Sequence, residues 1–163
     1  MKAQQIQDAV KYRELGKFDK AHDILIELLV QEPNDSVVNY QMAWLHDTQG
    51  KEREAVPYYE QAITNGLDGD DLRGALLGLG STYRCLGRYD EAAATLRRGM
   101  EIFPSAKEFP VFLAMTLYNK EQYAESVGML LQLLAESTQD DGILAYRRAI
   151  TYYHDKLDNI WDT

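Results

Sequence analysis

Apolar residues recur every three or four positions through most of this chain, which is the spacing that places them on one face of an α-helix. Segment 76–104 contains two such stripes, separated by Gly87 and closed by Pro104. The first stripe consists of Leu76, Leu79, Gly80 and Tyr83, and the second of Tyr89, Ala92, Ala93, Leu96 and Met100. Glycine favours the position just past a helix end, and proline cannot continue a helix. The segment is therefore predicted to form a helical hairpin with a glycine turn.

The same hairpin pattern occurs four times. Gly16, Gly50, Gly87 and Glu121 occupy the turn position, at intervals of 34, 37 and 34 residues. A fixed period of this length is typical of stacked helical repeats. We expect a single domain over 1–163, with four helix pairs at about 2–35, 36–69, 73–106 and 107–140. The three extra residues of the longer interval fall in segment 67–71, which we interpret as a longer loop with Asp70 or Asp71 capping the next helix.

One further amphipathic pattern follows the fourth pair. Its apolar stripe consists of Ile143, Tyr146, Ile150, Tyr153, Leu157 and Ile160. A repeat array needs a terminal helix to cover its last apolar face. We therefore expect one capping helix over about 141–161, with Tyr152 and Trp161 left exposed as a surface for self-association.

Three further positions of the repeat are restricted in residue type. The first helices share a small residue at Ala9, Ala43, Gly80 and Ala114, and the second helices share one at Ala21, Ala55, Ala92 and Ser126. An aromatic residue follows the turn in three copies, at Phe18, Tyr89 and Tyr123. With this pattern and period the chain resembles the tetratricopeptide-repeat family, and segment 43–134 resembles the small stand-alone bacterial proteins of that family. The resemblance implies an all-α, right-handed αα-superhelix and a protein-interaction module that forms dimers in some members.

Composition narrows the function classes. The chain has 17 Lys and Arg against 26 Asp and Glu, so its net charge is −9, which disfavours nucleic acid and anionic membranes as partners. No apolar run approaches the roughly 18 residues of a membrane-spanning helix. The only cysteine is Cys85, so no internal disulfide can form, and we expect a cytoplasmic protein.

The resemblance also implies a candidate binding site, because first helices of such repeats line the concave groove. The residues assigned to this peptide-binding groove are Arg13, Tyr40, Trp44, Gly78, Ser81, Arg84, Phe112, Met115, Tyr118 and Tyr146. Their aromatic rings and arginines favour a peptide with apolar anchors and one acidic group. We expect that acidic group to bind Arg84. Two alternatives stay open: Tyr40 and Trp44 pack on a neighbouring repeat, or Arg84 pairs with Asp47 or another helix carboxylate of the chain itself.

Other site types find little support in the sequence. The lysine and asparagine clamp with which some family members hold a carboxylate is missing, because Ile6, Val10 and Gln41 occupy those positions. His22, His46 and His154 lie in three different segments, so we expect no metal site and no cofactor. Cys85 has no candidate base near it in sequence, and we expect no enzyme activity. Two functions remain: binding a peptide segment in the groove, or self-association as a homodimer without a separate groove ligand.

Overall fold

The computed structural model describes residues 1–162, which contain helices and no strand. They form two compact units, residues 1–88 and the residues from 89 onward, and each unit is described by itself. The first unit contains α1 (Lys2–Glu14), α2 (Phe18–Gln31), α3 (Ser36–Thr48), α4 (Glu52–Thr64) and α5 (Gly69–Cys85). The second contains α6 (Tyr89–Ile102), α7 (Glu108–Asn119), α8 (Tyr123–Ser137), α9 (Asp141–Ala145) and α10 (Arg147–Tyr153).

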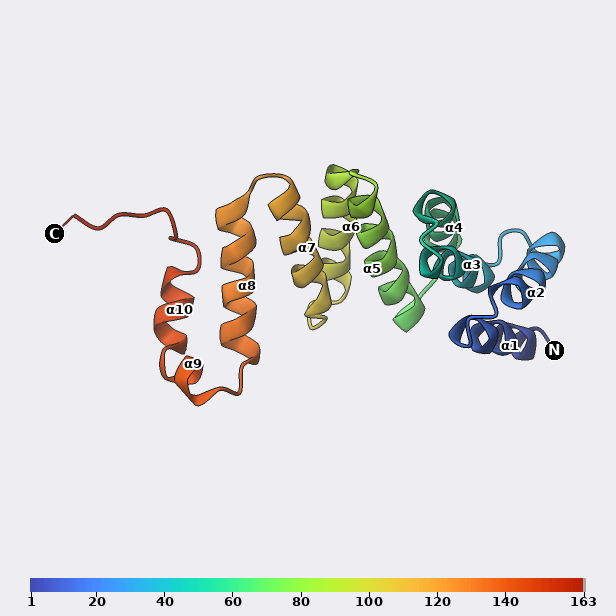
Figure 1. Ribbon diagram of the computed structural model, residues 1–163, viewed down its shortest axis with the longest axis horizontal. Helices are drawn as coiled ribbons and strands as arrows, with labels where there is room; N and C mark the ends of the chain where they lie inside the picture. The colour runs from blue at the N-terminus through green and yellow to red at the C-terminus, as the bar shows by residue number, and fades with distance from the viewer. Residues whose placement is uncertain (163) are drawn as a thin grey trace. The chain divides into compact units, whose positions relative to one another are not determined.

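In the first unit, α1 pairs with α2 and α3 pairs with α4, and the next first helix packs on each pair (Figure 1). The small positions predicted at Ala9, Ala21, Ala43 and Ala55 are completely buried at these crossings. Because they carry only a methyl group, the helix backbones approach closely and the larger Leu25, Met42 and Leu45 interlock around them. The alternation of first and second helices thus follows from the sequence pattern.

The four predicted turn positions share one backbone conformation. Gly16, Gly50 and Gly87 have φ between +66° and +74°, and Glu121 has φ of +61°. At each turn the following N–H bonds to the carbonyl five residues back, as Lys17 N does to Tyr12 O at 2.8 Å. This Schellman arrangement requires a left-handed residue after the helix, which glycine adopts freely. The predicted turn positions, spaced by 34, 37 and 34 residues, are therefore confirmed, including the one at which glutamate stands in place of glycine.

The prediction of a longer loop over 67–71 is wrong. Gly69, Asp70 and Asp71 are helical, and Asp68 stands at the N-cap, so the three extra residues lengthen α5 to 17 residues. The acidic residues of this first turn are favoured there because they face the positive end of the helix. The added turn places Asp71 and Gly74 beside Tyr40 of α3.

In the second unit, α6, α7 and α8 continue the alternation. A β-carbon on Gly99 of α6 would lie within 3.0 Å of the Phe109 ring of α7, and the Ser126 hydroxyl of α8 donates to the Ala114 carbonyl of α7 at 2.6 Å. The capping segment differs from the expected single helix. It breaks at Tyr146 into α9 and α10, helix ends at Tyr153, and neither short helix has a buried residue. Figure 1 shows α10 running beside α8.

Candidate functional site

A buried arginine and an exposed tryptophan meet on the first unit. Arg13, at the end of α1, is only 7% exposed, and its Nη1 donates a 2.6 Å hydrogen bond to Gln41 Oε1 of α3. Its guanidinium carbon lies 3.9 Å from the centre of the Trp44 ring, which is a cation–π stack. Trp44 itself remains 43% exposed. The structure therefore brings together two of the residues that the sequence assigned to the groove, one helical repeat apart.

Tyr40 joins this pair and connects it to the next repeat. Its ring lies 5.7 Å from the Trp44 ring and 6.3 Å from the Tyr59 ring of α4. Glycines of α5 make room for both tyrosines: a β-carbon on Gly74 would fall well inside 3.0 Å of Tyr40 Oη, and one on Gly78 would lie 2.5 Å from Tyr59 Oη. Gly78 is thus the close-approach position of the α4–α5 crossing. Burial, followed by the nearby charge of Asp71, raises the pKa of Tyr40 to about 12.

Asp47 forms the polar end of the same surface. Tyr59 donates to its Oδ2 at 3.1 Å, and the Thr82 hydroxyl lies 3.2 Å from its Oδ1 and 2.8 Å from the Gly78 carbonyl. Burial raises the pKa of the Asp47 carboxyl, while the two hydrogen bonds act in the opposite direction. Burial also raises the pKa of Tyr59, and the Asp47 charge adds to this effect. Asp47 is therefore held by the hydroxyl groups of Tyr59 and Thr82.

The remaining assigned residues are more dispersed. Ser81 and Arg84 are half-buried on α5, and Arg84 interacts with other groups of the chain. In the second unit Phe112 and Met115 are half-buried on α7, whereas Tyr118 is exposed and meets the Tyr123 ring edge-on at 5.3 Å. Tyr146 lies between α9 and α10 and is exposed. The structure thus gathers Arg13, Tyr40, Trp44 and Gly78 around one surface and leaves the second-unit residues as separate exposed or half-buried groups.

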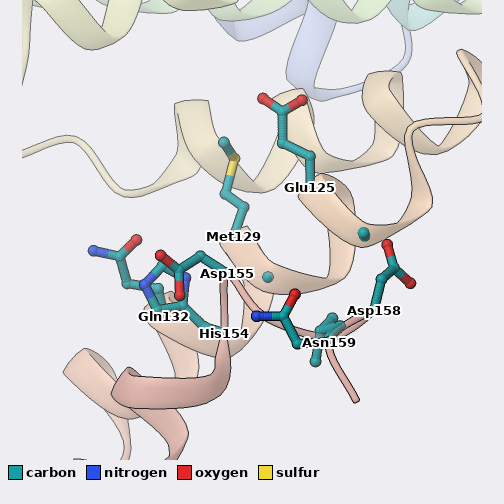
Figure 2. Close-up of a pocket in the computed structure, with 10 residues that line it drawn as sticks. Glu125, Met129, Gln132, His154, Asp155, Asp158 and Asn159 are labelled. Atoms are coloured by element: carbon teal, nitrogen blue, oxygen red, sulfur yellow. The ribbon is translucent and has the colours of Figure 1, made fainter. Parts of the chain in front are cut away.

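A cavity of about 400 Å³ lies in the second unit, between α8 and the chain that follows α10. Figure 2 shows the residues that line it. Glu125, Met129 and Gln132 line it from α8, and His154, Asp155 and Asp158 from the terminal segment. The chain crosses α8 at Gly128, where a β-carbon would clash with the His154 carbonyl oxygen. Asp155 is paired with Lys156 at 2.6 Å. Among residues 1–162, no cluster of three or more His, Cys, Asp or Glu has the geometry to hold a metal ion.

The sequence profile of a family described as "Tetratrico peptide repeat" matches residues 36–157, well over half of the chain. The chain belongs to the tetratricopeptide-repeat family. A crystal structure described as that of YrrB, a TPR protein with an unusual peptide-binding site, superposes with a TM-score of 0.72 and 17% sequence identity, over 93% of this chain and 77% of that chain. At that identity the likeness shows the fold alone. No curated protein matches the chain.

The all-α tetratricopeptide fold predicted from the repeats is therefore confirmed. Tetratricopeptide proteins are typically non-catalytic interaction scaffolds, which makes this chain a protein-interaction module. No helix among the described residues is long and apolar enough to span a membrane. Sequence reasoning did not assign Tyr59 to the site, because it lies on a second helix. The available signal was Gly78, since a glycine inside a helix often marks close approach of another group.

Proposed function

We propose that this tetratricopeptide protein binds a peptide segment of a partner protein on the surface formed by α1, α3 and α5. The family supplies the general class of function, and YrrB shows that the same fold can carry a peptide-binding site. The observation that carries the proposal is the pair of Arg13 and Trp44: a nearly buried cation lies beneath an indole that is still 43% exposed. Large aromatic side chains and arginine are the residues that most often supply binding energy at protein interfaces.

The acidic group of the ligand is assigned to Arg13 in place of Arg84, which the sequence had suggested. Among the described residues, no carboxylate lies within ion-pair distance of its guanidinium, and burial lowers its pKa. A guanidinium has five N–H donors, of which Gln41 takes one. None of its nitrogens is both fully buried and without a hydrogen bond, so the free donors still reach the surface. A ligand carboxylate bound there offsets the cost of a buried charge that the chain itself leaves without an anion.

The ligand chemistry follows from this geometry. Trp44 offers one ring face to Arg13 and its remaining surface to an apolar or prolyl side chain of the peptide. We therefore propose a segment with an acidic group next to an apolar anchor. Ser81 and Arg84 of α5 are proposed as further contacts of the peptide within the first unit. The cytoplasm is the compartment we propose, supported by the single free thiol of Cys85, and the net charge of −9 disfavours nucleic acid as a ligand.

A peptide-display selection against the whole chain tests the proposal. We expect selected peptides to be enriched in Asp, Glu or a free C-terminal carboxylate beside an apolar residue. Their affinity is then measured for wild type, Arg13→Met and Trp44→Ala. Lys11→Met is the matched control, because Lys11 is an exposed cation on the same helix and its loss changes the net charge equally. We expect about a 10-fold or greater loss for Arg13→Met and Trp44→Ala, and about a 2-fold loss or less for Lys11→Met.

Circular dichroism spectra equal to wild type establish that the variants are folded. Peptides without an acidic preference, or affinities that Arg13→Met and Trp44→Ala leave unchanged, would place the binding site elsewhere on the molecule. An equal loss for Arg13→Met and Lys11→Met would reduce the role of Arg13 to the net charge of the surface.

A further inference from the structure

The second unit presents an apolar stripe on α8. Tyr123, Val127, Leu130 and Leu134 follow the i, i+4, i+7, i+11 spacing of one helix face and are 41–51% exposed. Tyr118 of α7 extends the stripe at one end, through its contact with Tyr123. An apolar patch of several hundred Å² is often a functional surface.

At the two central positions of the stripe, most of the corresponding residues in the earlier second helices are buried. Counted from each turn, Leu130 corresponds to Leu25, Tyr59 and Leu96, which are at most 2% exposed, whereas Leu130 is 42% exposed. Val56 and Ala93 are likewise buried at the position of Val127. In each earlier pair, the next first helix covers this face: α3 packs on α2, α5 on α4 and α7 on α6. The α8 stripe is therefore the face that a following helix occupies everywhere else in the chain.

The terminal segment packs on a different side of α8. Gly128 and Ala135 are buried beneath it, although the corresponding residues of α2, α4 and α6 are exposed. The His154 carbonyl crosses Gly128, and Arg147 bonds to the Ala135 carbonyl. Glycine at 128 permits this crossing, because any β-carbon there would meet the carbonyl oxygen. The capping segment thus covers the side that is normally exposed and leaves open the side that is normally covered.

We propose that a second copy of this chain covers the α8 stripe, so that two α8 helices pack antiparallel about a two-fold axis. The stripe itself carries no charge. Glu125 lines the cavity on the opposite side, and Glu136 pairs with Lys107 at 2.7 Å. A second copy of a chain with net charge −9 can therefore approach without placing like charges against each other, whereas a charged partner finds no complementary group on the stripe.

A two-fold axis between Val127 and Leu130 makes the stripe self-complementary. Each end, at Tyr118 and Tyr123, then meets Leu134 of the other copy, and the same patch serves both partners. With an aromatic side chain carrying about 150–250 Å² of surface, two tyrosines and three aliphatic residues exposed to about half expose on the order of 400 Å² per copy. Two copies bury on the order of 800 Å², the size of a weak or transient interface, so we expect a dissociation constant in the micromolar range or above.

Sedimentation equilibrium between about 1 and 200 μM, a range that spans micromolar dissociation constants, tests the proposal. Wild type should pass from the 18.6 kDa monomer to a dimer. Leu130→Glu should weaken the dimer at least 10-fold. The matched control is Val30→Glu, which puts the same charge on an exposed apolar position of α2 and should leave association unchanged. Tyr152→Glu tests the terminal aromatic residues instead and should also have no effect.

Disulfide cross-linking tests the antiparallel geometry in a Cys85→Ser background. Positions 123 and 134 lie about 16 Å apart along the helix at 1.5 Å per residue, whereas a disulfide needs Cα atoms within about 7 Å. A mixture of Tyr123→Cys and Leu134→Cys chains should therefore form the mixed disulfide, and neither chain alone should form a homodimeric one.

A chain that stays monomeric throughout the concentration range overturns the proposal. The stripe would then be exposed to solvent or covered by a different protein. A dimer that Leu130→Glu leaves intact, or that Tyr152→Glu dissociates, places the interface elsewhere. Efficient cross-linking of Tyr123→Cys to itself overturns the antiparallel pairing. These results are independent of peptide binding, because the stripe lies wholly in the second unit and Arg13 and Trp44 lie in the first.

Discussion

Replacing Gly74 by alanine is expected to destabilise the protein, although alanine is the better helix former. Gly74 lies within α5, where alanine alone would stabilise the helix by about 0.5–1 kcal/mol. The added β-carbon, however, would fall well inside 3.0 Å of Tyr40 Oη, a distance that packed side chains do not tolerate. Tyr40 is nearly buried between Trp44 and Tyr59, so its ring cannot swing away freely. Overpacking of this kind costs about 1–3 kcal/mol.

The same geometry predicts a specific rescue. The next atom that the β-carbon would meet is Tyr40 Cζ at 3.1 Å, which a small shift relieves. Tyr40→Phe removes the hydroxyl oxygen, so Gly74→Ala should become neutral or stabilising by up to about 1 kcal/mol in that background. The double-mutant cycle should then give a coupling of about 1–3 kcal/mol between the two positions.

Urea unfolding of the four proteins, followed by circular dichroism and by tryptophan fluorescence, measures this coupling. Changes in the midpoint at constant slope report stability. Equal effects of Gly74→Ala in the wild-type and Tyr40→Phe backgrounds would refute the close approach of α3 and α5 at this point. If Gly74→Ala alone were as stable as wild type, Tyr40 would have room to move away from the added β-carbon.

Two further predictions concern a turn and a histidine. Glu121→Gly should stabilise the protein by about 0.5–1 kcal/mol, because φ of +61° strains a residue with a β-carbon, and a lower urea midpoint would contradict this. Burial, followed by the charge of Lys51, lowers the pKa of His46 from its ordinary value of 6.5. As the pH falls, His46 is therefore protonated in the unfolded chain before it is protonated in the folded chain. The stability of the protein should then fall as the pH drops below about 6.5. The His46→Phe variant can keep the stacking on Tyr58 and should lose part of this pH dependence. Urea unfolding at pH 5 and 7.5 measures the dependence, and an unchanged difference between the two pH values would assign the effect to other titrating groups.

Local features of this protein were determined by its sequence. The spacing of apolar residues predicted the paired helices. The repeated turn position predicted the four helix ends at Gly16, Gly50, Gly87 and Glu121, all of which are left-handed in the structure. These features depend on contacts within a few residues, so a local pattern contains the necessary information. The small residues at Ala21 and Ala55 likewise identified the helix crossings, because only short side chains fit where backbones meet.

Tertiary packing decided the features that relate distant segments. Asp47 and Thr82 lie 35 residues apart, and their contact depends on how α5 sits against α3 and α4. Residues 67–71 contain glycine and aspartates that suit a loop as well as a helix start, and their helical state brings Asp71 and Gly74 beside Tyr40. The stripe 143–160 showed an amphipathic segment but not the side of α8 on which it packs. That side was decided by Gly128, whose missing side chain lets the His154 carbonyl cross α8 and leaves Leu130 exposed.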